Sequence, residues 1–68
     1  MNKIKWIKNI IFNGVQTIWS FETITITKDN RHGSDKNFPY RLEINNRYMG
    51  DYRKLLSAKE DGIIFKDN

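Results

Sequence analysis

The stretch FPYRLEINNRYMGDYRKLLSAKEDG, residues 38–62, predicts a strand, a tight turn, a second strand and a short helix. In its first part apolar and polar side chains alternate, which is typical of a strand with one buried face. Asn45-Asn46 follows, and asparagine tolerates the positive φ that a two-residue hairpin turn requires. We therefore expect an antiparallel hairpin centred on these two residues.

The length of this turn decides which side chains the second strand buries. With two residues in the turn, Leu42 faces Met49. In the same register, Ile44 faces the stem of Arg47. With three residues and a bulge, Tyr48 points into the core instead. The pattern leaves both registers open.

A short helix is expected after Gly50, opened by Asp51 or Lys54. Gly62 can adopt the left-handed conformation that ends many helices, so it predicts the stop. Helical spacing predicts one buried stripe, which comprises Tyr52, Leu55, Leu56 and Lys59. A helix of two to three turns is too short to persist alone and must pack on the hairpin.

The segment Tyr48-Met49-Gly50-Asp51-Tyr52, followed by Leu55 and Ala58-Lys59, resembles part of a known family. It is similar to the aromatic-x-Gly-x-aromatic segment and following helix of AP2-like and integrase arm-type DNA-binding domains. The resemblance covers residues 38–62. It implies a three-stranded antiparallel sheet backed by a helix, with the sheet entering the major groove of DNA.

Residues 2–12 predict a basic amphipathic helix that ends at Asn13-Gly14. Its apolar stripe comprises Ile4, Ile7 and Ile11, with Trp6 and Ile10 beside it. The stripe could pack on the sheet, lie on an anionic membrane or dock in a partner's groove. Packing on the sheet is favoured, because a chain of 68 residues can scarcely spare five large apolar residues from its core.

Residues 17–27, TIWSFETITIT, predict one long first strand, because β-branched and aromatic residues dominate and the pattern alternates. One face would carry Ile18, Ser20, Glu22, Ile24 and Ile26, and the other Trp19, Phe21, Thr23, Thr25 and Thr27. The polar residues 28–37 predict a long connecting loop. The tail, residues 62–68, is expected to form an edge strand or to plug the core.

These elements predict one small α+β domain, residues 1–68. Its expected parts are an N-terminal amphipathic helix, a three-stranded antiparallel sheet with the tail as an optional fourth strand, and a short C-terminal helix. The chain has no cysteine, so neither a disulfide nor a thiolate zinc site supports its small core. Homodimerisation would be one way to enlarge that core.

Twelve Lys and Arg residues against eight Asp and Glu residues give a net charge of +4, which favours polyanionic partners. No apolar run approaches the roughly 18 residues of a membrane span. Lys5 and Lys8 interrupt any signal-peptide core. We therefore expect a cytoplasmic protein, with membrane association disfavoured.

Catalytic patterns are missing from the sequence. His32 is the only histidine, so a two-histidine metal site is excluded. Ser34, His32 and a nearby Asp lie in one loop, which lacks the rigid orientation that a triad needs. A chain this small also has little room for a pocket of about 300 Å³. We expect no enzyme activity, metal, cofactor or small-molecule substrate.

Non-catalytic binding remains, and DNA is the expected partner. The candidate nucleic-acid-binding residues are Arg41, Arg47, Arg53, Lys28, Arg31 and Lys36. On the sheet side opposite the helix, Arg41 and Glu43 are expected beside the threonines at 23, 25 and 27, and a β-ribbon fits the major groove.

Two alternatives are kept. In the first, the protein is a phage- or plasmid-encoded inhibitor or adaptor that blocks a host protein. Its candidate contact residues are Trp6, Trp19, Phe21 and Tyr48. In the second, the basic N-terminal helix holds the protein on a membrane surface.

Overall fold

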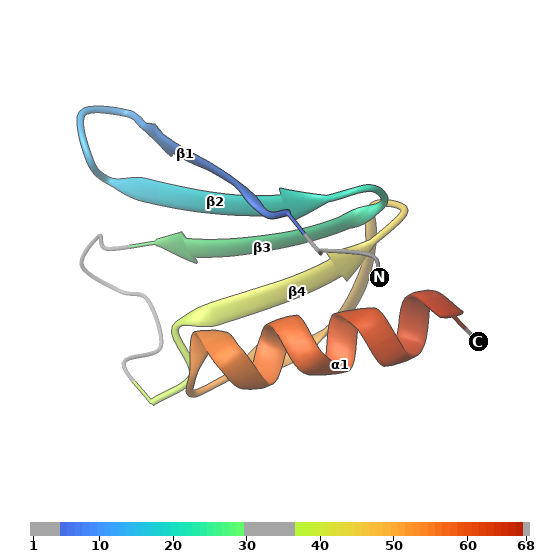
Figure 1. Ribbon diagram of the computed structural model, residues 1–68. Helices are drawn as coiled ribbons and strands as arrows, with labels where there is room; N and C mark the ends of the chain where they lie inside the picture. The colour runs from blue at the N-terminus through green and yellow to red at the C-terminus, as the bar shows by residue number, and fades with distance from the viewer. Residues whose placement is uncertain (1–4, 30–36, 68) are drawn as a thin grey trace.

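A computed structural model describes residues 5–29 and 37–67 (Figure 1). These residues form one antiparallel sheet of five strands in the order β1-β2-β3-β4-β5, followed by one helix. The elements are β1 (Ile7–Ile11), β2 (Gln16–Phe21), β3 (Ile24–Asp29), β4 (Tyr40–Ile44), β5 (Arg47–Tyr52) and α1 (Leu55–Asp67). The expected combination of a small antiparallel sheet and a helix is confirmed. The expected N-terminal helix and the sheet of three or four strands are wrong.

Residues 7–11, placed in a helix by the sequence pattern, form the edge strand β1. The other residues of the predicted helix that precede position 5 lie outside the described residues. A tight turn follows β1, in which Phe12, Asn13 and Gly14 all have positive φ. This turn folds the chain back, so that β1 pairs with β2 from Ile7↔Ser20 to Ile11↔Gln16. The membrane hypothesis rested on an amphipathic helix here, and these residues form a strand instead.

Residues 17–27 form two strands instead of one, because the chain reverses at Glu22-Thr23. Glu22 has a φ of 53° in this turn, a conformation that costs roughly 1 kcal/mol for a residue with a side chain. The reversal pairs Phe21 with Ile24, and paired residues point to the same side of a sheet. Trp19 and Phe21, predicted opposite Ile24 and Ile26, therefore share one face with them, whereas Ile18 lies on the other face. Lys28 and Asp29, predicted in the loop, belong to β3.

The β4–β5 hairpin turns at Asn45-Asn46 as predicted, and of the two turn lengths that the sequence left open it has the two-residue one, with φ of 54° at Asn45 and 63° at Asn46. Ile44 pairs with Arg47, as the two-residue register requires. A bulge between Leu42 and Glu43 then shifts the register, so Leu42 faces Gly50 and not Met49.

Helix α1 begins at Leu55, and the Lys54 carbonyl accepts the first hydrogen bond, from the Ala58 amide (3.2 Å). The helix continues through Gly62 to Asp67, so the predicted stop at Gly62 and the predicted tail strand are both wrong. Leu56, predicted in the buried stripe, is 67% exposed. The stripe that faces the sheet is Leu55, Ala58, Gly62 and Ile63.

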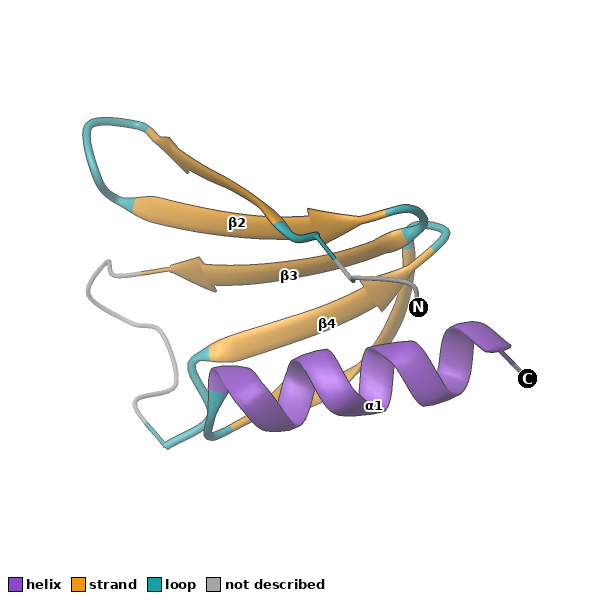
Figure 2. Ribbon diagram, in the orientation of Figure 1, coloured by secondary structure: helices purple, strands orange, loops and turns teal. Residues whose placement is uncertain are grey.

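The core lies between α1 and the sheet, where Ile24, Ile26, Leu42 and Ala58 are completely buried. The helix packs on β3, β4 and β5 and covers that part of one sheet side (Figure 2). A Cβ added to Gly62 would lie 2.9 Å from Ile24 Cγ2 and 3.2 Å from Leu42 Cδ1. The absence of a side chain at this position therefore allows the helix to lie close to the sheet.

Tyr52 joins β5 to α1. Its hydroxyl donates a hydrogen bond of 2.7 Å to the Asp61 carboxylate. Burial, and then this hydrogen bond, raise the pKa of Tyr52 from 10.0 to about 12. The neutral phenol is thus the form that the fold favours.

We predict that Gly62→Ala destabilises the protein. Alanine is the better helix former by about 1 kcal/mol, but overpacking against a stiff, buried isoleucine costs about 1–3 kcal/mol. Thermal unfolding should show a lower Tm for Gly62→Ala than for the natural chain. Ser57→Ala, an exposed position of the same helix, is the matched control and should leave Tm unchanged or slightly raised. An increased Tm for Gly62→Ala would mean that the helix can move off the sheet freely.

We predict that Tyr52 makes stability decline at alkaline pH. Unfolded tyrosine ionises near pH 10, whereas folded Tyr52 does so near pH 12. Its stabilisation is therefore complete below pH 10 and is lost as the pH rises from 10 to 12. Tyr52→Phe should be less stable at pH 7 by about 1 kcal/mol, and its urea-unfolding free energy should fall less steeply over this interval. Parallel curves for the two proteins would contradict this assignment.

Candidate nucleic-acid interface

The two sides of the sheet differ in what covers them. Helix α1 packs on β3, β4 and β5, and among the described elements it makes no comparable contact with β1 or β2. The helix side of β1 and β2 therefore remains uncovered by secondary structure. Strand alternation and pairing define the residues of β1–β4 on the helix side as Lys8, Ile10, Thr17, Trp19, Phe21, Ile24, Ile26, Lys28, Tyr40, Leu42 and Ile44.

Two aromatic rings and two lysines lie together on this side. Trp19 and Tyr40 have ring centroids 5.8 Å apart and planes tilted by 59°. The Lys8 ammonium lies 6.0 Å from the Trp19 ring centroid, and the Lys28 ammonium lies 5.5 Å from that of Tyr40. The register produces both contacts, because Lys8 pairs with Trp19 and Lys28 pairs with Tyr40.

A third pair extends this cluster to the helix. The ring of Trp6, a residue just before β1, has its centroid 5.7 Å from that of the Phe21 ring. The Lys59 ammonium of α1 lies 5.4 Å from the Trp6 ring centroid. We call the three pairs together the aromatic–lysine surface, which comprises Trp6, Lys8, Trp19, Lys28, Tyr40 and Lys59.

The helix side of β1–β4 carries no Asp or Glu at its described positions. Its lysine charges are therefore not neutralised by carboxylates of these strands. A lysine over an aromatic ring at a partly exposed site is held by only about 0.5–1 kcal/mol. Such a lysine can move from its ring to a phosphate without a large loss.

The opposite side of the sheet, here called the open side, has more carboxylates than cations. Arg41 is its only cation within the described strands, and its carboxylates are Asp29, Glu43 and Asp51. Arg41 lies 4.0 Å from Asp51, and Asp51 also accepts a 2.8 Å hydrogen bond from Tyr48. That hydrogen bond raises the pKa of Tyr48.

The predicted neighbours on the open side are confirmed in part. Thr25 pairs with Glu43, and Thr27 pairs with Arg41. Thr23 lies in the β2–β3 turn instead. This side therefore carries more carboxylates than cations, and it is not the basic face that the sequence predicted.

The other predicted nucleic-acid-binding residues are dispersed. Lys28 belongs to the aromatic–lysine surface. Arg53 lies over the Phe38 ring, 5.6 Å from its centroid. Arg47 is the first residue of β5 and lies next to the β4–β5 turn. Arg31 and Lys36 lie outside the described residues.

The four predicted protein-contact aromatics do not form one patch. Trp6, Trp19 and Phe21 pack against the core from the helix side. Tyr48 is 57% exposed and lies on the open side, because Glu43 is its partner. The alternative register with a buried Tyr48 is therefore wrong.

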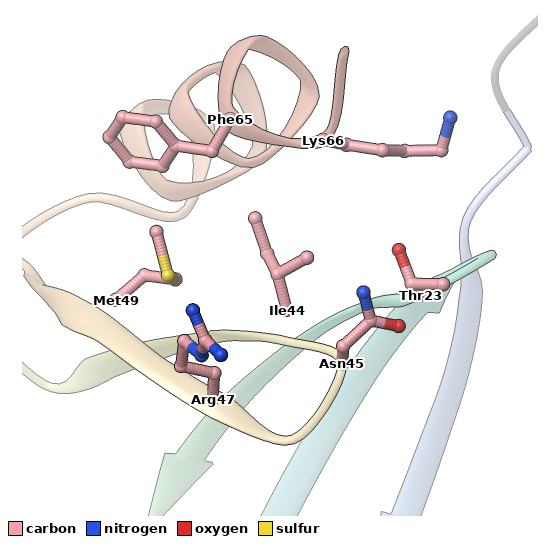
Figure 3. Close-up of a pocket in the computed structure, with 7 residues that line it drawn as sticks. All are labelled: Thr23, Ile44, Asn45, Arg47, Met49, Phe65 and Lys66. Carbon is pink, nitrogen blue, oxygen red and sulfur yellow. The ribbon is translucent and has the colours of Figure 1, made fainter. Parts of the chain in front are cut away.

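A pocket of about 370 Å³ lies between the end of α1 and the β4–β5 turn, so the expectation that the chain lacks room for one is wrong. Figure 3 shows Phe65 and Lys66 of the helix across from Met49, Ile44 and Arg47, with Asn45 and Thr23 beside them. The described lining has no carboxylate, histidine or cysteine. Lys66 pairs with Glu22 at 3.4 Å. The lining offers no acid–base pair for catalysis.

Sequence reasoning missed three members of the aromatic–lysine surface, namely Lys8, Tyr40 and Lys59. Alternation within Ile7–Ile11 would have placed Lys8 on one sheet side, but only if this segment had been interpreted as a strand. Tyr40 was expected in a strand, without a cation beside it. Lys59 was expected in the buried helical stripe, and no local pattern links it to Trp6.

Comparisons with protein-family models, curated proteins and solved structures found no match to this chain. Among the described residues, no helix combines the length and apolar character needed to cross a membrane. Over the same residues, no group of three or more His, Cys, Asp or Glu side chains is arranged to hold a metal ion. The fold class and the aromatic–lysine surface therefore carry the functional argument.

Proposed function

We propose that this protein is a non-catalytic nucleic-acid-binding protein and that the nucleic acid lies on the aromatic–lysine surface. The observation that carries the proposal is the placement of three lysine ammonium groups over three aromatic rings on one side of the molecule. Cations attract the phosphate backbone, and aromatic rings offer surfaces for bases. Their combination in one place matches both chemical parts of a nucleotide.

The charge distribution supports this side over the open side. On the open side Arg41 is engaged by Asp51, and the neighbouring Glu43 and Asp29 would repel a phosphate backbone. On the helix side the lysines face rings, which leaves their charge available to an anion. The proposal thus retains Lys28 from the residues expected from sequence and assigns no contact to Arg41. It does not depend on the resemblance to AP2-like domains, which stays a prediction.

We predict that Lys8→Gln/Lys28→Gln weakens binding to labelled nucleic acid, measured by fluorescence anisotropy over a series of KCl concentrations. Each lost phosphate contact lowers the log–log salt slope by about 0.7–0.9, so the double variant should lower it by roughly 1 or more. Arg41→Gln/Arg47→Gln removes the same charge elsewhere and is the matched control. It should retain most of the affinity and of the slope.

Equal losses in the two double variants would show that net charge alone governs binding, and would refute the assignment to this surface. No binding of either single- or double-stranded nucleic acid at low salt would refute the proposed function. Circular dichroism and Tm of each variant show whether its fold is intact before affinities are compared.

Binding to a protein partner is the second candidate function. It is favoured by the exposed apolar side chains on the outer side of α1. Leu56 and Ile64 are 67% and 56% exposed, two turns apart on this helix.

We predict that the natural chain captures a protein partner in stoichiometric amount from nuclease-treated lysate of the source cell. The variant Leu56→Ser/Ile64→Ser should not capture that partner. Retention of the nucleic-acid affinity by that variant would separate the two functions. Capture that is unchanged in the variant would exclude this helix as the contact surface.

A further inference from the structure

The width of the uncovered sheet restricts which nucleic acid can reach the aromatic–lysine surface. Neighbouring strands lie about 4.8 Å apart, so the strip formed by β1, β2 and the near side of β3 is roughly 10 Å wide. Helix α1 stands beside this strip on the same side and, with its side chains, is about 10–12 Å in diameter. Trp19 lies on this strip, whereas Tyr40 lies on β4, which the helix contacts, so the two rings lie on either side of the border between the strip and the helix-covered part of the sheet. Figure 1 shows α1 lying alongside β4.

This arrangement disfavours a duplex. A sheet reads duplex DNA by protruding into a major groove about 12 Å wide and 8.5 Å deep. Here the helix protrudes, and the sheet strip is recessed beside it. In a duplex the faces of the bases are also already stacked on one another, so they cannot stack on Trp19 or Tyr40. A single strand is narrow enough to follow the strip and has free base faces.

The geometry of the rings suits stacking. The tilt of 59° means that Trp19 and Tyr40 are not stacked face to face. Lysine ammonium groups lie over these rings, and a flexible lysine side chain can move aside to contact the adjacent phosphate. Trp19 and Tyr40 are half-buried, so their positions are fixed by the core while part of each ring stays accessible.

We propose that the aromatic–lysine surface selects single-stranded nucleic acid, with bases stacked on Trp19 and Tyr40 and with Lys8 and Lys28 on the neighbouring phosphates. This inference rests on the proposed function and specifies its ligand class. Stacking tolerates any base, because every base has a π-face. The sequence preference is accordingly weak. Single-stranded DNA and RNA share this chemistry, and the test includes both.

The test measures the affinity of the full chain for three labelled oligomers of the same length: oligo-dT, oligo-U and a mixed-sequence DNA duplex. About 12 nucleotides lies within the site sizes of roughly 4–16 nucleotides found for compact β domains. Both single strands should bind at least about tenfold more tightly than the duplex. Trp19→Leu should weaken single-strand binding about tenfold, whereas Trp19→Phe, which keeps a ring, should weaken it less. The salt slope should not change in either variant, since no charge is lost.

Tryptophan fluorescence provides a measurement that does not depend on the folding of Trp19→Leu. In Trp6→Phe, Trp19 is the only tryptophan, and a base stacked on it should quench its emission as single strand is added. Quenching by oligo-dT or oligo-U, but not by the duplex, supports the inference.

The inference is overturned if the duplex binds as tightly as the single strands, or if Trp19 emission in Trp6→Phe does not respond to a bound single strand. In either case a loss of affinity in Lys8→Gln/Lys28→Gln would leave the broader proposed function standing. No binding to any of the three oligomers would refute both.

Discussion

The close approach of α1 to the sheet at Gly62 is the constraint on which the rest of the structure depends. A side chain at this position would collide with Ile24 and Leu42, so the helix is seated directly over β3 and β4. A helix about 10–12 Å wide cannot cover five strands spaced about 4.8 Å apart. Seated over one part of the sheet, it leaves the helix side of β1 and β2 without a covering helix or strand among the described residues. Trp6, Lys8 and Trp19 lie on that uncovered part instead, and with Lys28, Tyr40 and Lys59 next to it they form the aromatic–lysine surface.

The parts of the fold that could be predicted were those with a local chemical signal. Asn45-Asn46 indicated its hairpin because both residues accept positive φ, and the structure has that turn. Glu22-Thr23 makes an equally tight turn without glycine, asparagine or proline, so residues 17–27 carried no sign of a reversal. Ile7–Ile11 is so short that Ile7 and Ile11 would share a face in either a helix or a strand. Only pairing with β2 decides the matter, and pairing is not local. Gly62 was interpreted as a helix stop, whereas its role comes from contact with residues distant in sequence.

The candidate site was less predictable than the fold for a related reason. Which side of a sheet a residue occupies depends on every turn between it and its neighbours. The unrecognised reversal at Glu22-Thr23 placed Trp19 opposite the isoleucine face, although it pairs with Ile26 in the core. Lys28 was identified as a basic residue but assigned to a loop, so its ring partner could not be anticipated. The bulge at Leu42 and Glu43 has a similar effect, because it separates Leu42 from Met49 and pairs it with Gly50, whereas the two-residue turn places Tyr48 opposite Glu43 on the open side.

The division of charge between the two sides follows from this topology and bears on how the surface would work. On the open side, Arg41, Tyr48 and Asp51 satisfy one another, so a phosphate would have to displace an existing ion pair and hydrogen bond. On the helix side each lysine rests on a ring, an interaction that leaves its full charge and shields the ring in the absence of a ligand. Transfer of a lysine to a phosphate exposes the ring face at the moment a base can cover it. The two exchanges compensate each other, so the resting cation–π pairs need not oppose binding. On the open side Arg41 also lies over a ring, that of Tyr48, but the excess of carboxylates there would repel a phosphate.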